Sequence, residues 1–214
     1  MPTAIIDVDR TPFEGKALSD FVVINKDAKT GAVTVSVLDT NQNVIYSLNG
    51  FQLMQDFNHI DATVHADNGN FKGIMGIFEQ VASDLFLKDG IYSLWARDEA
   101  DPAQTGKLPS SNMYGTHPMF MARGKDGADG TQAWIGGFYN LANAQDWRVM
   151  NDASSGEVNL KTYSAGGLGD LFFFTGVDPN EIVTKYHTIV GTPVLPPQWA
   201  LGWNQCRWGY NSTA

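Results

Sequence analysis

The amino-acid sequence predicts a mostly β fold of antiparallel strands, with one helix near its C-terminal end. Runs of β-branched residues alternate with polar residues at a period of two, which is typical of strands with one buried face. The 22 glycines and 9 prolines favour many turns. Only residues 178–190 combine helical spacing with a start and a stop signal.

Composition narrows the class of protein. The 214 residues are 43% hydrophobic and 17% charged, so the chain can bury a sizeable core, as one large all-β domain or two small ones. The net charge of −9 disfavours nucleic acid and anionic membranes as partners. Sugars are neutral and are not repelled. The single cysteine, Cys206, excludes an intrachain disulfide.

The sequence shows neither a membrane span nor a signal peptide. No stretch approaches the ~20 apolar residues that span a bilayer. The first ten residues, MPTAIIDVDR, lack the basic segment and apolar run of a secretory signal. Either the protein is not secreted, or this chain starts downstream of the natural start.

The N-terminal quarter is expected to form an antiparallel meander with one buried and one solvated face. Its strands are AIIDV (4–8), FVVIN (21–25), GAVTVSVLD (31–39) and NVIYSL (43–48). The next alternating run places His59, Asp61 and His65 on one strand face. A metal site there lacks an evident fourth ligand, so a solvated strand face is favoured.

A charged cluster follows the next pair of expected strands. Residues 73–79 form a strand whose two glycines indicate a bulge or a close backbone approach. After the turn at 88–90, strand 91–95 ends in Arg97-Asp98-Glu99, which opens a loop bearing Pro and Gly. This strand end is a plausible site, or a solvated turn with a surface ion pair.

The remaining strands are expected at 119–123, 133–139, 157–164 and 170–176. The GKDGADG segment at 124–130 suggests a calcium loop, but it lacks the EF-hand pattern, so an exposed hairpin loop is favoured. Residues 171–174 are continuously apolar, which predicts a strand buried on both faces.

The sequence predicts both ends of the helix. Asp178 is a good N-cap, Pro179 suits the first helical position, and Glu181 completes a capping-box pattern. Gly191 is the expected stop, and His187 is expected on the polar face. An apolar stripe comprises Ile182, Val183, Tyr186, Ile189 and Val190.

A proline-stiffened connector and an aromatic segment end the chain. Each residue before a proline in 192–197 is pushed out of the α region, so this stretch should be extended. From Trp199 to Gln205, bulky and small residues alternate, which predicts a strand with one crowded face. Asn211-Ser212-Thr213 is an N-glycosylation triplet, of a kind that is common by chance.

Several of these stretches resemble the N-terminal region of family 31 glycoside hydrolases. The resemblance rests on KDGIYSLWARDEADP (88–102), YGTHPMF (114–120), DLFFFTGVDPNEIVTKY (170–186) and HTIVGTPVLPPQWALGWNQCRWGY (187–210), and it runs from about Gly73 to Tyr210. It implies a galactose-mutarotase-like β-sandwich over 1–177, a helix and Pro-rich connector over 178–197, and the first strand of a truncated (β/α)8 barrel over 198–214.

The resemblance also implies an activity that the chain alone cannot perform. The family's retaining α-glucosidases use two barrel aspartates, with the nucleophile in a W-x-D-M-N-E-like motif. No such motif occurs here, so we expect no catalytic residue, metal or cofactor in the chain, and no activity from it alone. Hydrolase, transglycosidase, lyase and xylosidase chemistry stay open, because residues outside the chain decide among them.

Three substrate-binding residues follow from the resemblance. Asp98 matches the loop aspartate that binds substrate hydroxyls, although Ala100 stands where the family often has Thr. Tyr210 matches an aromatic residue of the sugar pocket. Trp208 is a second candidate, with core packing as its alternative, and Arg207 is expected to support the domain junction.

The resemblance implies two partners: an α-glucoside or oligosaccharide substrate, and the catalytic barrel, in the same precursor or as a separate chain. It also implies the secretory pathway, a lysosome or the extracellular space. The alternative function is a non-catalytic β-sandwich that binds glycans or another protein.

Overall fold

The computed structural model describes residues 22–26, 29–30, 33–39, 42–53, 58–66, 72–82, 84–98, 112–126, 130, 132–167, 170–205, 209 and 211. In that part of the chain the strands are β1 (Val22–Lys26), β2 (Val33–Leu38), β3 (Val44–Leu53), β4 (Asn58–His65), β5 (Ile74–Phe78), β6 (Gly90–Leu94), β7 (Thr116–Arg123), β8 (Trp134–Asn140), β9 (Gln145–Asp152), β10 (Glu157–Ser164) and β11 (Asp170–Gly176). The helices are α1 (Pro179–Val190) and a 3₁₀ turn, Gln198–Leu201.

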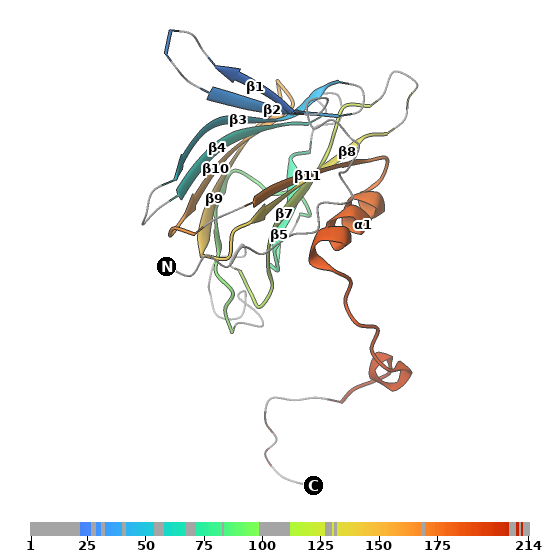
Figure 1. Cartoon of the computed structure of the whole chain (residues 1–214). Coiled ribbons are helices and arrows are strands. Elements are labelled where there is room, and N and C mark those ends of the chain that lie inside the picture. The colour runs from blue at the N-terminus through green and yellow to red at the C-terminus, as the bar shows by residue number, and fades with distance from the viewer. Residues whose placement is uncertain are drawn as a thin grey trace, which may run out of the picture.

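The strands form two antiparallel sheets that face each other (Figure 1). The seven-stranded sheet has the order β1-β2-β3-β4-β10-β9-β6, and the four-stranded sheet has the order β11-β8-β7-β5. The expected N-terminal meander is confirmed from β1 onward, and residues 4–8 lie outside the described part. The predicted β-sandwich is therefore the observed architecture.

The core lies between the two sheets, where alternate side chains of each strand point inward. Large aromatic residues fill its centre, with Trp147 of β9 and Tyr139 of β8 fully buried and their ring centroids 4.7 Å apart. Strand β9 was not predicted, although Gln145, Trp147 and Val149 are buried in alternation. The charged residues Asp146 and Arg148 between them mask the alternation of a strand that lies between β10 and β6.

A bulge bends the end of β5, as the two glycines of that strand predicted. The register with β7 shifts between Gly76 and Phe78. Gly76 has a φ of +112°, and a Cβ at this position would lie 2.5 Å from the carbonyl oxygen of Met119. Ile77 has a φ of +68°, which is rare for a β-branched residue. Strand β5 ends at this bulge, and Glu79 follows it directly.

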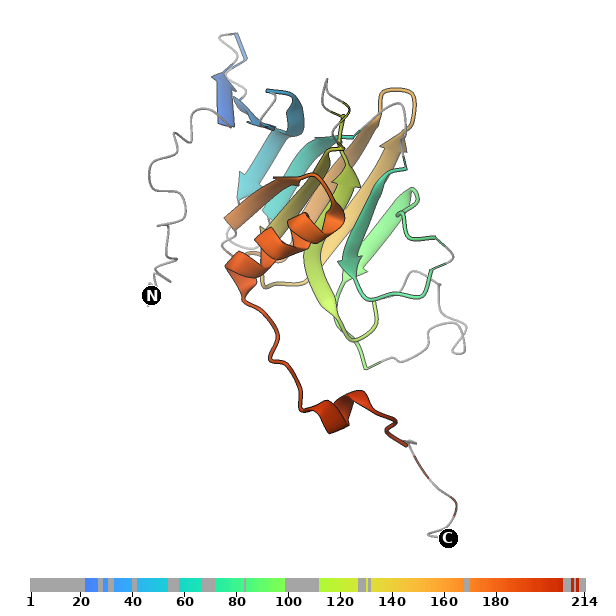
Figure 2. The same cartoon turned by 90° about the vertical axis from the view of Figure 1, so that its right-hand side faces the viewer.

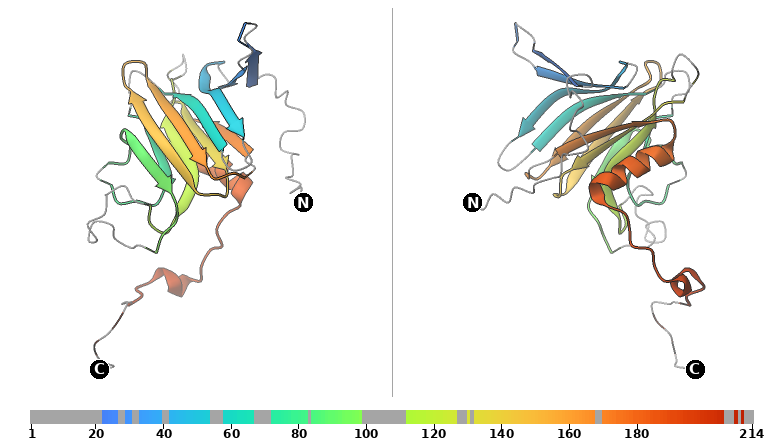
Figure 3. Two further views of the ribbon diagram at one scale, coloured as in Figure 1. Left: turned by 90° about the vertical axis from the view of Figure 1, so that its left-hand side faces the viewer. Right: turned by 45° about the vertical axis from the view of Figure 1, so that its right-hand side comes forward.

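Helix α1 begins and ends where the sequence predicted. The Asp178 side chain accepts a hydrogen bond from the Glu181 N–H at 2.9 Å, and Gly191 closes the helix with a φ of +83°. Figures 2 and 3 show α1 lying on the outer face of the four-stranded sheet. Ile182 is fully buried there against Gly136, where a Cβ would lie 2.6 Å from the Ile182 Cγ2.

Strand β11 lies between the core and the helix, so both of its faces are covered. Leu171 and Phe173 pack against the core between the sheets. Phe172 and Phe174 pack with Ile182 and Tyr186 of α1. The run 171–174 was expected to be buried on both faces. Both faces do pack against apolar residues, but only Phe174 is buried and the other three residues are partly exposed.

The C-terminal segment departs from the prediction. The strand expected over Trp199–Gln205 is not formed: Gln198–Leu201 is a 3₁₀ turn, and residues 202–205 have no regular structure. A strand needs a neighbour for its backbone hydrogen bonds. Figure 1 shows this segment leading away from the sandwich after α1, so alternation alone cannot produce a ladder there. No helix in the described ranges is long and apolar enough to cross a membrane.

Candidate functional site

The candidate site lies at the C-terminal end of β6, on the loop that carries Asp98. Strand β6 is an edge strand that pairs with β9. It closes with a tight turn, in which the Trp95 N–H donates to the Ser93 carbonyl at 3.1 Å. The Trp95 side chain is 63% exposed, and Asp98 is exposed too. An aromatic surface and a carboxylate therefore lie close together in the chain, directly after β6.

A second segment, residues 112–115, braces this loop. Glu79, which follows the β5 bulge, holds it by three hydrogen bonds. The Glu79 N–H donates to the Gly115 carbonyl at 2.9 Å, and the Glu79 carbonyl accepts from Met113 at 3.0 Å. The Glu79 Oε2 accepts from the Gly115 N–H at 2.9 Å. The segment is thus fixed to the end of the four-stranded sheet.

Asn112 fixes the start of the same segment from inside the protein. Its side chain is buried, its Nδ2 donates to the Gly115 carbonyl at 2.8 Å, and its Oδ1 accepts from the Thr116 hydroxyl at 2.8 Å. A buried amide with both ends bonded is stable and holds one conformation. The turn at Tyr114 is therefore well defined.

A backbone hydrogen bond joins the braced segment to the Asp98 loop. The Arg97 N–H donates to the Met113 carbonyl at 2.7 Å. Partial desolvation, and then the proximity of the Asp98 carboxylate and of Glu79, raise the pKa of Tyr114 above its ordinary value. The exposed Tyr114 side chain therefore lies on the same side of the molecule as two carboxylates.

An open groove of about 590 Å³ runs beside the loop. It lies between the end of β6, the start of β7, the β8–β9 connection and α1. Trp95, His117 and Tyr186 contribute rings to its walls, and Asn140 and Asn143 contribute amides. Rings and amides together suit a ligand with apolar faces and hydroxyl groups.

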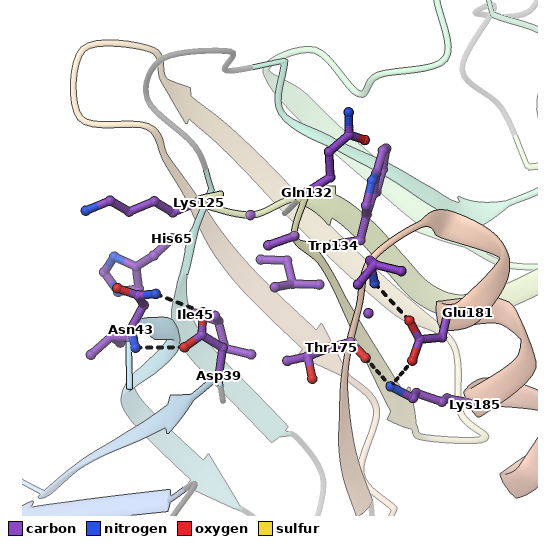
Figure 4. A pocket seen from close by; sticks show the side chains of 16 residues that line it. Asp39, Asn43, Ile45, His65, Lys125, Gln132, Trp134, Thr175, Glu181 and Lys185 are labelled. Atoms are coloured by element: carbon purple, nitrogen blue, oxygen red, sulfur yellow. Dashed lines mark hydrogen bonds and ion pairs between the residues drawn. The ribbon is translucent and has the colours of Figure 1, made fainter. Parts of the chain in front are cut away.

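A smaller cavity of about 210 Å³ opens at the other end of the sandwich (Figure 4). Asp39, Glu181 and Lys185 already have partners within it. Asp39 accepts from the Asn43 N–H at 2.8 Å, and the Lys185 ammonium contacts Glu181 at 2.7 Å and the Thr175 carbonyl at 2.5 Å. We assign no ligand to this cavity, and Asp98 is not part of it.

The structure describes one of the three predicted binding residues. Asp98 is exposed at the loop described above. Tyr210 and Trp208 lie outside the described residues, as do Arg207 and Cys206. Sequence reasoning missed Tyr114 and Glu79 as neighbours of Asp98, although Tyr114 opens the YGTHPMF motif.

The residues considered for a metal site share one face of β4, but each has a separate partner. His59 stacks on Tyr163 with ring centroids 4.7 Å apart. Asp61 contacts the Lys161 ammonium at 3.1 Å, and His65 contacts Glu157 at 3.2 Å. Within the described ranges no three potential ligands converge. In the segment considered for calcium, Asp126 pairs with Arg123 at 2.7 Å, and residues 127–129 lie outside the described part.

Comparisons with known proteins find relatives that are much longer than this chain. No protein-family model matches the chain. It is 30% identical over 175 residues to Glucoamylase 1 of Candida albicans, covering 81% of this chain and 16% of the relative. It is 39% identical over 142 residues to the Lysosomal alpha-glucosidase of Mus musculus, covering 66% of this chain and 13% of the relative. The chain therefore spans less than a fifth of these relatives.

A solved structure supports the same architecture. The crystal structure of an ER glucosidase II heterodimeric complex, of a catalytic subunit and the binding domain of a regulatory subunit, matches 88% of this chain and 27% of the matched one. The TM-score is 0.61 and the sequence identity is 16%. At that identity the match shows the shared fold alone.

Proposed function

Since the chain is related to the α-glucosidases of glycoside hydrolase family 31, we propose that it forms the β-sandwich part of a retaining α-glucosidase. The sandwich, over residues 1–177, supports a catalytic barrel and supplies one loop to its substrate site. The complete enzyme removes terminal α-linked glucose. The sequence similarity to several α-glucosidases is the observation that carries this proposal.

The exposed segment after α1 supports a partner domain. Its large apolar side chains are 68–91% exposed, namely Val194, Leu195, Trp199, Leu201 and Trp203. An apolar stretch of this size is unfavourable in water and marks a surface that another body covers. We propose that 178–197 connect the two domains and that 198–214 join the barrel, where Trp199–Gln205 gain the strand neighbours that they lack in this structure.

Asp98 is the proposed contact to substrate within this chain. Its carboxylate lies exposed on the loop at the end of β6, with acceptor positions for sugar hydroxyls. Tyr210 and Trp208 are proposed to add aromatic surface to the same pocket. The two catalytic aspartates belong to the barrel. One attacks the sugar to form the glycosyl intermediate, and the other protonates the leaving oxygen and then activates the water that hydrolyses the intermediate. We place the enzyme in the secretory pathway, in line with its lysosomal relatives.

Activity measurements test the proposal. The chain alone should leave a nitrophenyl α-glucoside unhydrolysed, whereas an enzyme that joins it to its barrel should release glucose with retention. In that enzyme Asp98→Ala should raise KM about 10-fold or more, because a hydrogen bond to a charged group is lost. Asp170→Asn, an exposed aspartate at the start of β11, is the matched control. Turnover by the chain alone would contradict the proposal.

The exposed Trp95 beside the groove favours one alternative, a non-catalytic module that binds glycans. That alternative expects the isolated chain to bind maltooligosaccharides, with quenching of tryptophan fluorescence that Trp95→Ala abolishes. The leading proposal expects weak binding at most, because half of the sugar pocket belongs to the barrel.

A further inference from the structure

We propose that the groove beside the Asp98 loop is the surface on which the catalytic barrel of the complete enzyme packs. The inference rests on the proposed function, because that function requires a second domain, and it assigns this domain a place on the sandwich. The occupant is a protein surface that is apolar and uncharged where it meets the groove.

The groove lies between the two segments through which the sandwich is proposed to reach the barrel. The end of β6 borders it with Trp95 and Ala96, and Asp98 follows two residues later. Helix α1 borders it with Tyr186, four residues before the helix ends at Val190. Figure 2 shows the connector leaving the sandwich from that end of α1. A domain that contacts both the Asp98 loop and the connector therefore lies across the groove.

The composition of the groove is that of an interface core. Among the described residues that line it there is no Asp, Glu, Lys or Arg, although the chain has a net charge of −9. Its rings come from Trp95, His117, Phe138 and Tyr186. Few charged residues and many aromatic ones distinguish the buried core of a protein–protein interface from the rest of a surface. The groove therefore fits a protein partner.

Two other surfaces of the sandwich have the opposite composition. The outer face of the seven-stranded sheet carries an ion pair between Lys161 and Asp61 at 3.1 Å. The smaller cavity contains the pair of Lys185 and Glu181 at 2.7 Å. A partner that covered either surface would have to remove charged groups from water, which is unfavourable. Of these three surfaces, the groove is the one that a second domain covers with the smallest desolvation penalty.

Hydroxyl-radical footprinting with mass spectrometry tests the proposal by comparing the isolated chain with the enzyme that contains it. The rate of modification of Trp95 should fall about 5-fold or more in the enzyme, because an interface core is packed as densely as a protein interior. Ile91 is the matched control, since it is 67% exposed, lies in β6 and does not line the groove. Its rate should stay unchanged. An unchanged rate at Trp95 overturns the proposal.

A charge placed in the groove gives a second test. Ala142 is exposed and lines the groove, so Ala142→Glu should move the thermal unfolding midpoint of the isolated chain by less than about 2 °C. In the enzyme, the unpaired carboxylate should weaken the packing and raise the modification rate of Trp95 about 3-fold or more. Ala82→Glu is the control, because Ala82 is exposed outside the groove. Equal protection of Trp95 in both variants would contradict the proposed surface.

Two other occupants give different results in the isolated chain. A second copy of the chain would protect Trp95 increasingly as the chain concentration rises. A glycan would protect Trp95 when a maltooligosaccharide is added, with Ile91 as the internal reference for the radical dose. Either result assigns the groove to that occupant and overturns the barrel as its partner.

The footprint and the activity fail independently. If the enzyme hydrolyses an α-glucoside while Trp95 stays accessible, only the docking surface is overturned. If Trp95 is protected in an enzyme that leaves α-glucosides intact, the proposed activity fails and the docking surface stands.

Discussion

The sandwich core and the segment after α1 hold the same kinds of side chain in opposite surroundings. Trp147 in β9 is 0% exposed, whereas Trp203 beyond the helix is 90% exposed. Both residues lie in alternating apolar stretches. Alternation therefore sets which side chains share a face, whereas burial depends on whether a second surface is present to cover that face.

The sharpest test of this comparison substitutes one tryptophan in each region. Trp147→Ala should lower the free energy of unfolding by about 3–5 kcal/mol, because it leaves a cavity among packed rings. It also removes the indole donor to Gln145, at 2.9 Å. Trp203→Ala should change that free energy by less than about 0.5 kcal/mol. Urea denaturation followed by circular dichroism measures both. Equal losses would mean that the segment packs on the sandwich.

The next test concerns the boundary between the two regions, where α1 docks on the sheet. Ile182→Ala should lower the free energy of unfolding by about 2–5 kcal/mol, as a fully buried aliphatic side chain is truncated. Val190→Ala, near the exposed end of the same helix, is the control and should have little effect. If the two variants match, α1 is not part of the cooperative fold. Thermal unfolding of both variants distinguishes these cases.

Alkaline titration probes the core through its paired tyrosines. Tyr46 and Tyr139 hydrogen-bond through their hydroxyls inside the sandwich, and burial is the main cause that raises the pKa of each. Their contribution to stability is complete below the unfolded tyrosine pKa of about 10. It declines above that pH and is lost as the pH rises through the raised folded pKa values. The expected loss is about 1.4 kcal/mol per pH unit for each tyrosine.

Urea midpoints at pH 9, 10 and 11 measure this slope. The double variant Tyr46→Phe/Tyr139→Phe should show a flatter profile, because neither buried group then titrates. An unchanged slope would mean that other groups cause the alkaline loss. The segment after α1 is exposed, so we expect it to contribute nothing to the loss of stability with pH.

The smallest effect is expected at the start of α1. Asp178→Ala removes the side-chain bond to the Glu181 N–H and should cost about 1 kcal/mol of unfolding free energy. Asn180→Ala, an exposed neighbour, is the control.

Lys185 and the Val177 N–H lower the pKa of Glu181. The contribution of Glu181 to stability is therefore present above the ordinary glutamate pKa and is lost as the pH falls through the lowered pKa. Solvent exposure of this ion pair keeps the acid effect small.

Local pattern predicted much of the sandwich because each signal acts within a few residues. The strands at residues 157–164 and 170–176 were expected with the same bounds that β10 and β11 have. Asp178 and Gly191 defined the helix through bonds to backbone groups within a turn. Strand β9 was missed because its exposed polar residues outweigh a buried alternation of three side chains.

The candidate site was predictable only in part. Asp98 was predicted as a binding residue from the resemblance to a family and from its position at a strand end. The backbone bond from Arg97 to Met113 and the bonds of Glu79 join segments far apart in sequence, and no local pattern encodes them. Tyr210 and Trp208 remain predictions, since they lie outside the described residues.

The class of fold, most strand positions, both helix boundaries and the family resemblance could be predicted from the sequence, because propensity, alternation and capping act over a few residues. Tertiary contacts set three further features: the order of the strands, the joining of residues 112–115 to Glu79 and to the Asp98 loop, and the absence of a strand over Trp199–Gln205. Each of these depends on which distant segments meet. For Trp199–Gln205, no neighbouring strand lies among the described residues to complete the backbone hydrogen bonds of the strand that the alternation predicts.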